Sequence, residues 1–265
     1  MNFLHAFLLG IIQGLTEFIP VSSTAHLLIG QKLLGIPADD AMFSFLVIVQ
    51  LGTIVSLIIF YWKDLLTIVK ATFNFRRSTP ERNLGFYIIV ATIPALLAGY
   101  LLKDAVETLF RQPMLEASIR LFSAAILLTL AEWLTRKNRS LPSMTWLDAL
   151  IVGLFQIISV FPGASRSGTT ISGGMFRGFD RPSAARFAFL MSVPVMLAAG
   201  GYEILDVLKM PNLGEFLPLL ALGFVTAAIV GWFAIKWLID YLGKHSLYVF
   251  AVYCTVIGTI VFFLR

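Results

Sequence analysis

The first polar segment of the chain, residues 13–26, combines an amide, a carboxylate, hydroxyls and an imidazole. Gln13 and Glu17 are four residues apart, so a helix would place both on one face. Pro20 would end that helix, and the hydroxyl residues after it can cap a second helix, whose free N–H groups favour an anion. Ser23 and His26, three residues apart, would share the first turn of this second helix. These residue types can bind an anionic group and supply a nucleophile or a base.

The second polar segment, residues 161–174, holds one guanidinium, five hydroxyls and four glycines within fourteen residues. Glycine lets backbone N–H groups approach a ligand closely, and arginine makes bidentate contacts with phosphate oxygens. Small hydroxyl residues also occur where membrane helices pack together, which is the alternative interpretation. Arg166 favours a phosphate site, because a buried cation needs an anion, and Glu17 or a phosphate is its expected partner.

The composition indicates the surroundings of both segments. Hydrophobic residues make up 58% of the 265 residues and charged residues 13%, whereas soluble proteins average about 45–50% and about 25%. The chain is therefore expected to be an integral membrane protein with almost no domain outside the bilayer. Its single cysteine, Cys254, excludes a disulfide framework and a zinc cluster. The net charge of +5 arises in short loops between apolar runs, so no nucleic-acid partner is expected.

A membrane setting favours a functional interpretation of the first polar segment over a purely structural one. A serine three residues before a histidine, taken alone, fits a polar helix break with a core histidine. Glu17 weighs against that interpretation, because carboxylates inside a membrane are costly and usually functional.

Six apolar runs are candidates for membrane helices, which need about 20 residues. Two further apolar stretches, 1–35 and 147–178, each break at a proline, and neither half of either stretch is long enough to cross alone. Irregular backbone in lipid would leave polar groups unpaired, so we expect both stretches to be re-entrant and to line a cavity. The predicted fold is an all-α integral membrane protein with about six transmembrane helices and two re-entrant broken-helix segments. The predicted spans are 41–62, 84–102, 117–134, 184–205, 216–235 and 246–264.

The basic residues favour one orientation, because lysine and arginine concentrate on the cytoplasmic side. Thirteen of the 20 fall on one side of the predicted spans, beginning with a loop at 63–82. Six lie at the other side or its edge, Arg120 among them, and the one left over is Arg166, which sits inside the second broken segment. Both termini would then face outward. Glu132 lies about one turn from Arg136, which predicts an interfacial position for this carboxylate.

The chain also contains one internal repeat. Residues 10–13 (Gly-Ile-Ile-Gln) are echoed at 153–156 (Gly-Leu-Phe-Gln), and residues 20–23 (Pro-Val-Ser-Ser) at 162–165 (Pro-Gly-Ala-Ser). Each broken segment precedes three spans, so the second copy, 141–265, would be inverted relative to the first, 1–140, within one membrane domain. Inverted repeats typically place a site near the bilayer midplane, where broken helices meet. We therefore expect the two polar segments to meet there.

The segment from Gln13 to His26 resembles the first signature of the bacterial undecaprenyl-pyrophosphate phosphatases of the bacitracin-resistance type, and Pro162 to Thr169 resembles the second. The resemblance extends over essentially the whole chain, although Gln13 stands where many members have glutamate and Ala25 replaces a more usual glycine. It implies hydrolysis of undecaprenyl pyrophosphate to undecaprenyl phosphate, the lipid carrier of cell-wall synthesis. It also implies a divalent cation, Mg²⁺ or Ca²⁺, and a site in the bacterial plasma membrane that opens to the outer face.

The same resemblance implies a role for each matching residue. The catalytic residues are His26, Ser23, Glu17 and Arg166, and the metal ligands are Glu17 and Gln13. The substrate phosphates would be bound by Ser22, Thr24, Ser165, Arg166, Ser167, Gly168 and Thr169. Whether His26 or Ser23 takes the phosphoryl group, or His26 acts as a base, stays open.

Two other functions fit parts of the pattern. A transporter or flippase for a polyprenyl phosphate lipid explains Arg166 and the broken helices, but it gives Ser23 and His26 no necessary role. The other membrane phosphatase superfamily requires a second catalytic histidine, and neither His5 nor His245 has suitable neighbours. The expected partners are a polyprenyl pyrophosphate lipid and the bilayer, and a homodimer is left open.

Overall fold

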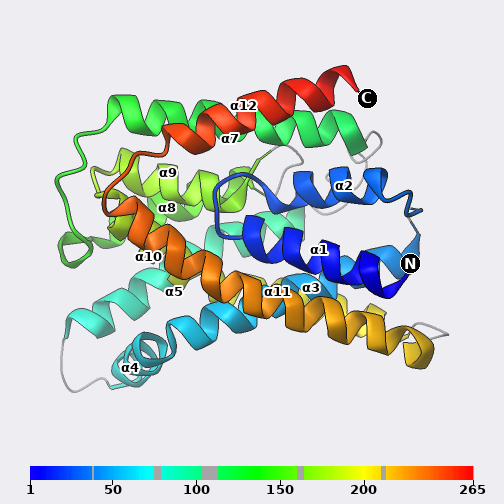
Figure 1. Ribbon diagram of the computed structural model, residues 1–265. Coiled ribbons are helices and arrows are strands. Elements are labelled where there is room, and N and C mark those ends of the chain that lie inside the picture. Colours follow the sequence, from blue (N-terminus) through cyan, green and yellow to red (C-terminus); the bar gives the residue numbers. More distant parts are fainter. Residues whose placement is uncertain (38, 75–78, 103–112, 160–163, 210–212, 265) are drawn as a thin grey trace.

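The computed structural model describes residues 1–37, 39–74, 79–102, 113–159, 164–209 and 213–264 (Figure 1). Within these ranges nearly every element is a helix, and the β-structure is limited to one isolated bridge between Arg139 and Phe179. The predicted all-α class is confirmed. Pro162 and Gly163, which belong to the second signature, lie outside the described residues.

Five helices are long enough and apolar enough to cross a membrane, namely α3 (Asp40–Phe60), α5 (Pro80–Leu101), α7 (Pro113–Leu134), α10 (Arg181–Val207) and α11 (Leu213–Leu242). The protein is therefore a multi-pass membrane protein. The sixth predicted span is a helix, α12 (Tyr248–Phe263), but its 16 residues reach only about 24 Å, less than the hydrocarbon core of about 30 Å. It lies along α7 (Figure 1).

Each broken segment holds two separate helices. The first break, residues 17–22, is irregular, whereas residues 160–163 between the two helices of the second segment lie outside the described residues. The first segment consists of α1 (Phe3–Thr16) and α2 (Ser23–Leu33), and the second of α8 (Trp146–Ile158) and α9 (Arg166–Phe176). A short 3₁₀ turn, η1 (Leu141–Ser143), precedes α8. Each of the four helices has 14 residues or fewer, so none of them alone can cross a bilayer. This confirms the predicted breaks.

The predicted loop at 63–82 is wrong in its first half, because α4 (Trp62–Thr72) is a helix there. The sequence has too many charged residues for a span and is too short for one. Its apolar residues recur on one face, with Ile68 buried. Trp62, Val69 and the following Phe73 are exposed, which is typical of a helix at a membrane surface.

The first broken segment packs on α11 through glycines. Gly10 and Gly14 stand one turn apart on the face of α1 that meets α11, where a Cβ atom at Gly14 would lie 2.7 Å from Val230. Small residues at this spacing allow two membrane helices to approach closely. On the other side of the molecule α8 packs against α5, and Gly153 there faces Ala91.

The predicted repeat would make the pairs α1–α11 and α8–α5 equivalent. Helices α3 and α10 pack against each other, and α3 also packs against α11 as α10 does against α5. The division into inverted halves at residue 140 stays a prediction.

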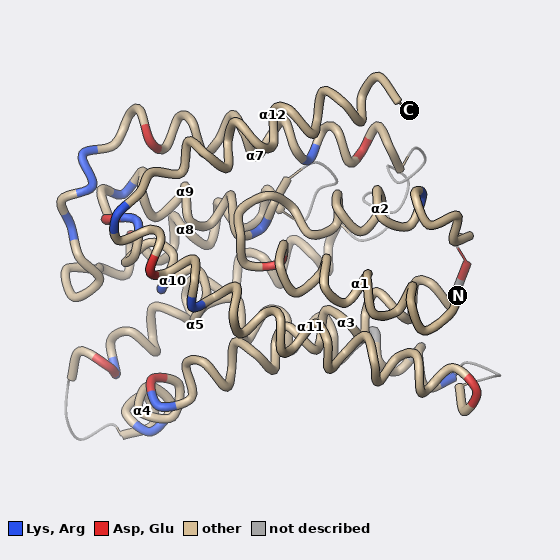
Figure 2. The backbone as a smooth tube through the Cα atoms, viewed as in Figure 1, with Lys and Arg blue, Asp and Glu red and all other residues tan. Residues whose placement is uncertain are grey.

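The charged residues are unevenly distributed. Figure 2 shows most lysines and arginines at the end of the molecule that holds α4, far from both termini. This matches the charge asymmetry expected from the sequence. The Arg120 side chain, expected near one edge of the membrane, is buried among other side chains in the first half of α7, one turn from Glu116.

Candidate active site

The two breaks bring together Glu17 and Arg166, two opposite charges that the sequence predicts inside the broken segments. Glu17 follows directly after α1, and Arg166 is the first residue of α9. Arg166 Nη2 donates to Glu17 Oε1 across 149 residues of sequence, forming an ion pair. The carboxylate is 3% exposed and the guanidinium 19%, so each charge depends on the other in this setting.

The second oxygen of Glu17 binds the rest of the first segment. Gln13 Nε2 donates to Glu17 Oε2 at 2.9 Å, and Ser23 Oγ donates to the same oxygen at 2.6 Å. Gln13 Nε2 also lies 3.5 Å from Thr53 Oγ1 on α3. The carboxylate thus joins the end of α1 to the start of α2, and it holds the Ser23 hydroxyl in the arrangement of a nucleophile beside a base.

The start of α9 is built by hydroxyl groups. Ser165 Oγ caps the helix by accepting from Gly168 N at 3.2 Å and lies 3.3 Å from Ser167 Oγ. Ser167 Oγ is 3.5 Å from Ile19 O, which links α9 to the first break. This arrangement directs the N-terminus of α9, which favours an anion, toward Glu17 and the first segment.

Two threonines of the second segment face their own helix. Thr169 Oγ1 and Thr170 Oγ1 donate to Arg166 O at 2.9 and 2.8 Å. Thr169 is fully buried, so in this state its hydroxyl supports the backbone at Arg166. A direct phosphate contact by Thr169 stays a prediction.

A small cavity lies beside the ion pair, with a volume of about 10 Å³. That is close to the space needed by one water molecule. It is too small for a phosphate group, so a ligand of that size requires the two breaks to move apart. The cavity is lined by Glu17, Phe18, Arg166, Ser167, Thr170, Ala188, Phe189 and Ser192.

His26 has two hydrogen-bond partners, one for each ring nitrogen. Nδ1 lies 2.9 Å from Ser22 O and Nε2 lies 2.8 Å from the hydroxyl of Tyr253 on α12. A carbonyl oxygen can only accept, so Nδ1 carries the proton of the neutral ring and Nε2 accepts from Tyr253. The two rings are also stacked, with centroids 5.6 Å apart. In this state Nε2 is therefore occupied, and no hydrogen bond among the described residues joins His26 to Ser23 or Glu17.

The residues around Ser23 have different environments. Ser22 has φ +68°, a left-handed conformation that is uncommon for serine and turns its carbonyl toward His26. Strain of this kind is concentrated at functional sites. Thr24 lies on the exposed face of α2, so the structure does not bring this predicted phosphate ligand to the ion pair.

The donor set near Glu17 limits how a divalent cation can bind. No group of three His, Cys, Asp or Glu side chains within the described ranges is placed to hold a metal. Glu17 offers one carboxylate, and Gln13 turns its amide nitrogen toward it. Mg²⁺ often takes only one or two carboxylates and completes its shell with water and substrate phosphates. The residues fit a cation held in that way.

Sequence reasoning missed the residues that fix the second segment. Asp148, fully buried in the first turn of α8, accepts from Arg139 at 2.7 Å and from Arg177 at 2.7 Å. Arg177 ends α9, so the carboxylate ties the start of α8 to the end of α9. Burial opposes ionisation of Asp148, but hydrogen bonds from Arg139, Arg177 and Thr145 outweigh it and hold its pKa well below the usual range.

Tyr253 was missed as well, and so were the partners of Glu132. Glu132 is buried and accepts from Arg181 at 2.5 and 2.7 Å, and its Oε2 lies 3.1 Å from Lys137 Nζ. Arg181 begins α10, so this pair joins two helices, whereas Arg136 is exposed. Contacts between residues 49 or 227 positions apart leave no signal in local spacing.

Comparison with known proteins gives a consistent set of relatives. An undecaprenyl-diphosphatase of Chloroherpeton thalassium is 41% identical over 97% of this chain and 95% of its own length. Proteins of the same name from Chlorobium phaeobacteroides and Mycobacterium marinum are 40% and 37% identical. They cover 97% and 100% of this chain, and 95% of each relative is covered. The family model described as bacitracin resistance protein BacA matches residues 6–260, and the chain belongs to that family.

Proposed function

We propose that this protein is a membrane undecaprenyl-diphosphatase. It hydrolyses undecaprenyl pyrophosphate to undecaprenyl phosphate and inorganic phosphate, and so returns the lipid carrier to cell-wall synthesis. The observation that carries the proposal is the Arg166–Glu17 ion pair between two broken helices, with a serine hydroxyl bound to the carboxylate. The names and full-length similarity of the relatives support it.

Arg166 and the start of α9 bind the pyrophosphate. A phosphate oxygen replaces Glu17 Oε1 as the partner of the guanidinium, and the hydroxyls of Ser165 and Ser167 and the N–H of Gly168 lie beside it. Phosphoryl transfer depends mainly on positioning and charge stabilisation. The apolar helices around the site accommodate the isoprenoid chain.

Two residues compete for the role of nucleophile. In one route Ser23 Oγ attacks the terminal phosphorus, its proton passes to Glu17, the bond to the lipid phosphate breaks, and water then releases the phosphate from the serine. The 2.6 Å bond from Ser23 to Glu17 supports this route. In the other route His26 Nε2 acts as nucleophile or base, which requires Tyr253 to release it.

A divalent cation, Mg²⁺ or Ca²⁺, is proposed as the cofactor, with Glu17 and Gln13 as its protein ligands. When bound, it neutralises charge on the phosphate oxygens. Once the substrate occupies Arg166, the carboxylate of Glu17 is no longer paired and can hold the cation.

The site is proposed to open to the outer face of the bacterial plasma membrane, because the basic end of the molecule fits the cytoplasmic side (Figure 2). That the protein has no nucleic-acid partner stays a prediction, and whether it forms a homodimer stays open. The transporter alternative is not favoured by the family, and it gives the Ser23–Glu17 bond no role.

The test is phosphate release by purified protein in detergent. Undecaprenyl pyrophosphate should yield one phosphate and undecaprenyl phosphate, and a chelator should abolish release until Mg²⁺ or Ca²⁺ is restored. The exposed Arg136→Ala variant serves as a matched control and should keep full activity. Lipid movement across proteoliposomes without any phosphate release would instead establish a transporter.

A further inference from the structure

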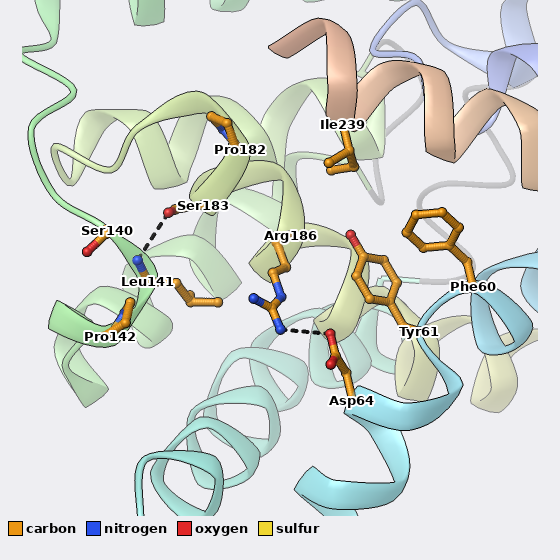
Figure 3. Close-up of a pocket in the computed structure, with 10 residues that line it drawn as sticks. All are labelled: Phe60, Tyr61, Asp64, Ser140, Leu141, Pro142, Pro182, Ser183, Arg186 and Ile239. Atoms are coloured by element: carbon orange, nitrogen blue, oxygen red, sulfur yellow. Dashed lines mark hydrogen bonds and ion pairs between the residues drawn. The ribbon is translucent and has the colours of Figure 1, made fainter. Parts of the chain in front are cut away.

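A second cavity, of about 500 Å³, lies at the basic end of the molecule and shares no residue with the Glu17 site. Its size is within the range of small-molecule sites. It forms where α3 passes into α4, beneath the start of α10 (Figure 3). The lining residues are Phe60, Tyr61, Asp64, Ser140, Leu141, Pro142, Pro182, Ser183, Arg186 and Ile239.

Tyr61 supplies a hydroxyl donor to the wall of this cavity. The residue as a whole is 7% exposed, and it lines the cavity. Figure 3 shows the hydroxyl pointing into the cavity near Arg186. Burial raises the pKa of Tyr61, so the group is a stable hydrogen-bond donor.

A cation and an anion stand next to this hydroxyl. Arg186 Nη2 donates to Asp64 Oδ2 at 2.7 Å, and the two side chains are 45% and 36% exposed. Figure 3 shows the other terminal nitrogen of Arg186 turned away from Asp64, toward the space bordered by Leu141. Arg186 and Tyr61 can thus donate to one anionic group while Asp64 accepts from a cationic group beside it.

Apart from Ser140 and Ser183, the remaining lining residues are apolar, and two of them continue onto the surface that faces lipid. Phe60 ends α3, and Ile239 belongs to α11. Ile59 beside Phe60 is 59% exposed, and Trp62 at the start of α4 is 58% exposed. Tryptophan is enriched where a membrane meets water. The cavity therefore combines a polar pocket with an apolar exit at the level of lipid head groups.

We propose that this cavity binds a phospholipid whose head group carries a primary ammonium next to its phosphate, as in phosphatidylethanolamine. Arg186 and Tyr61 hold the phosphate, Asp64 accepts from the ammonium, and Phe60 and Ile239 contact the acyl chains. A purely anionic head group would meet the carboxylate of Asp64 without a compensating cation. The site is independent of the proposed hydrolysis.

The test measures lipid binding to the delipidated full-length protein in detergent by native mass spectrometry. Phosphatidylethanolamine, phosphatidylglycerol and phosphatidylcholine with identical acyl chains are compared, and free phosphoethanolamine and inorganic phosphate are added as soluble probes. We expect phosphatidylethanolamine to bind about tenfold more tightly than phosphatidylglycerol, which corresponds to 1.4 kcal/mol. Phosphatidylcholine, which cannot donate a hydrogen bond to Asp64, should also bind more weakly.

Three variants assign the contacts. Asp64→Asn should remove the preference for phosphatidylethanolamine over phosphatidylglycerol. Arg186→Gln should weaken the binding of both lipids, and Tyr61→Phe should weaken the binding of both about fivefold. Tyr100→Phe is the matched control, because Tyr100 is 84% exposed at the far end of α5. Equal binding of the three lipids by the unaltered protein would overturn the proposal, and so would a preference that survives Asp64→Asn. Tight binding of free phosphoethanolamine would show a soluble ligand instead of a lipid.

Discussion

Gln13 in α1 and Gln156 in α8 occupy corresponding positions of the two broken segments, yet their side chains have different surroundings. Gln13 is bonded to Glu17 and lies near Thr53. Gln156 is equally buried, but neither its amide nitrogen nor its amide oxygen has a partner within the described ranges. Buried polar atoms without partners are rare in folded proteins. The same residue is therefore part of a polar network in one segment and isolated in the other.

The difference shows that the two segments have similar helices but contribute different functional groups to the candidate site. The first supplies the carboxylate, the serine hydroxyl and the imidazole, and the second supplies the guanidinium and the N-terminus of α9. The second is also clamped at its far end by Asp148, whereas the described residues contain no ion pair that closes α1 onto α2. On the proposed function, a half that binds the anion and is clamped by Asp148 thus faces a half that carries the reacting groups.

The largest effect is expected for the anion-binding half. Arg166→Ala should lower kcat/KM for phosphate release by about 10³-fold, since it removes the main charge-assisted donor to the phosphate. Arg166→Lys keeps the charge but loses the planar fork, so about 10²-fold is expected. Steady-state kinetics in detergent measure both. Near-normal activity of Arg166→Ala would mean that α9 does not bind the substrate.

The dependence of the two halves on each other can be measured without substrate. Glu17→Gln and Arg166→Gln should each lower the free energy of unfolding by about 3 kcal/mol, because each leaves one charge unpaired in a nearly dry site. The double variant should recover most of this loss. Denaturant unfolding in detergent measures the coupling free energy between Glu17 and Arg166. If the losses of unfolding free energy in the two single variants simply add in the double variant, the ion pair does not join the segments.

The clamp on the second segment predicts a pH dependence. The pKa of Asp148 is held below its usual value, so its ion pairs stabilise the folded state fully above about pH 4 and this stability is lost as the pH falls further. Asp148→Asn should cost about 2 kcal/mol at neutral pH. The melting temperature of the parent protein should fall more steeply below pH 4 than that of the variant. Parallel pH curves would contradict the assignment.

The first segment contacts α12 through the hydrogen bond between His26 and the hydroxyl of Tyr253. Tyr253→Phe removes the hydrogen bond to His26 Nε2. On the His26 route, which requires Tyr253 to release this nitrogen, kcat should stay the same or rise, whereas on the Ser23 route kcat should change less than about twofold. The protein has three histidines, so the His26 signals can be assigned by nitrogen NMR. The spectrum should show His26 Nδ1 protonated in the parent protein and a shifted His26 Nε2 signal in the Tyr253→Phe variant. An unchanged Nε2 signal would remove Tyr253 from the site.

The smallest effect should come from the isolated glutamine. Gln156→Leu removes two unpaired polar atoms and should change the free energy of unfolding by less than about 1 kcal/mol or raise it. Gln13→Leu, the matched change in the other segment, should destabilise the protein by about 1–2 kcal/mol and lower phosphate release. Equal losses in both variants would mean that Gln156 has a structural role comparable to that of Gln13.

Much of the fold follows from lengths that the bilayer imposes. The positions of the spans and of both breaks were predictable, because apolar runs and prolines mark them directly. The Glu17–Arg166 pair was predictable because a buried charge needs a counterion. The first half of the predicted loop at 63–82 is α4 instead, since an amphipathic helix of 11 residues falls below the length of a span.

The remaining contacts depend on packing that local sequence does not encode. Arg181 reaches Glu132, and Arg139 and Arg177 converge on Asp148, only because the ends of α7 and α9 lie close to the starts of α8 and α10. Tyr253 stands in an apolar run, where nothing distinguishes it from a lipid-facing aromatic residue. The left-handed Ser22 and the exposed Thr24 likewise depend on how α2 starts after the break.

The carboxylate of Glu17 gives Arg166 a partner that never diffuses away. A pyrophosphate carries more negative charge than a monophosphate, so it competes better for the guanidinium than either product does. After cleavage, Glu17 can take Arg166 back and displace the inorganic phosphate. The ion pair that keeps the empty site electrically neutral would then also act as a built-in competitor that expels product and readies the enzyme for its next turnover.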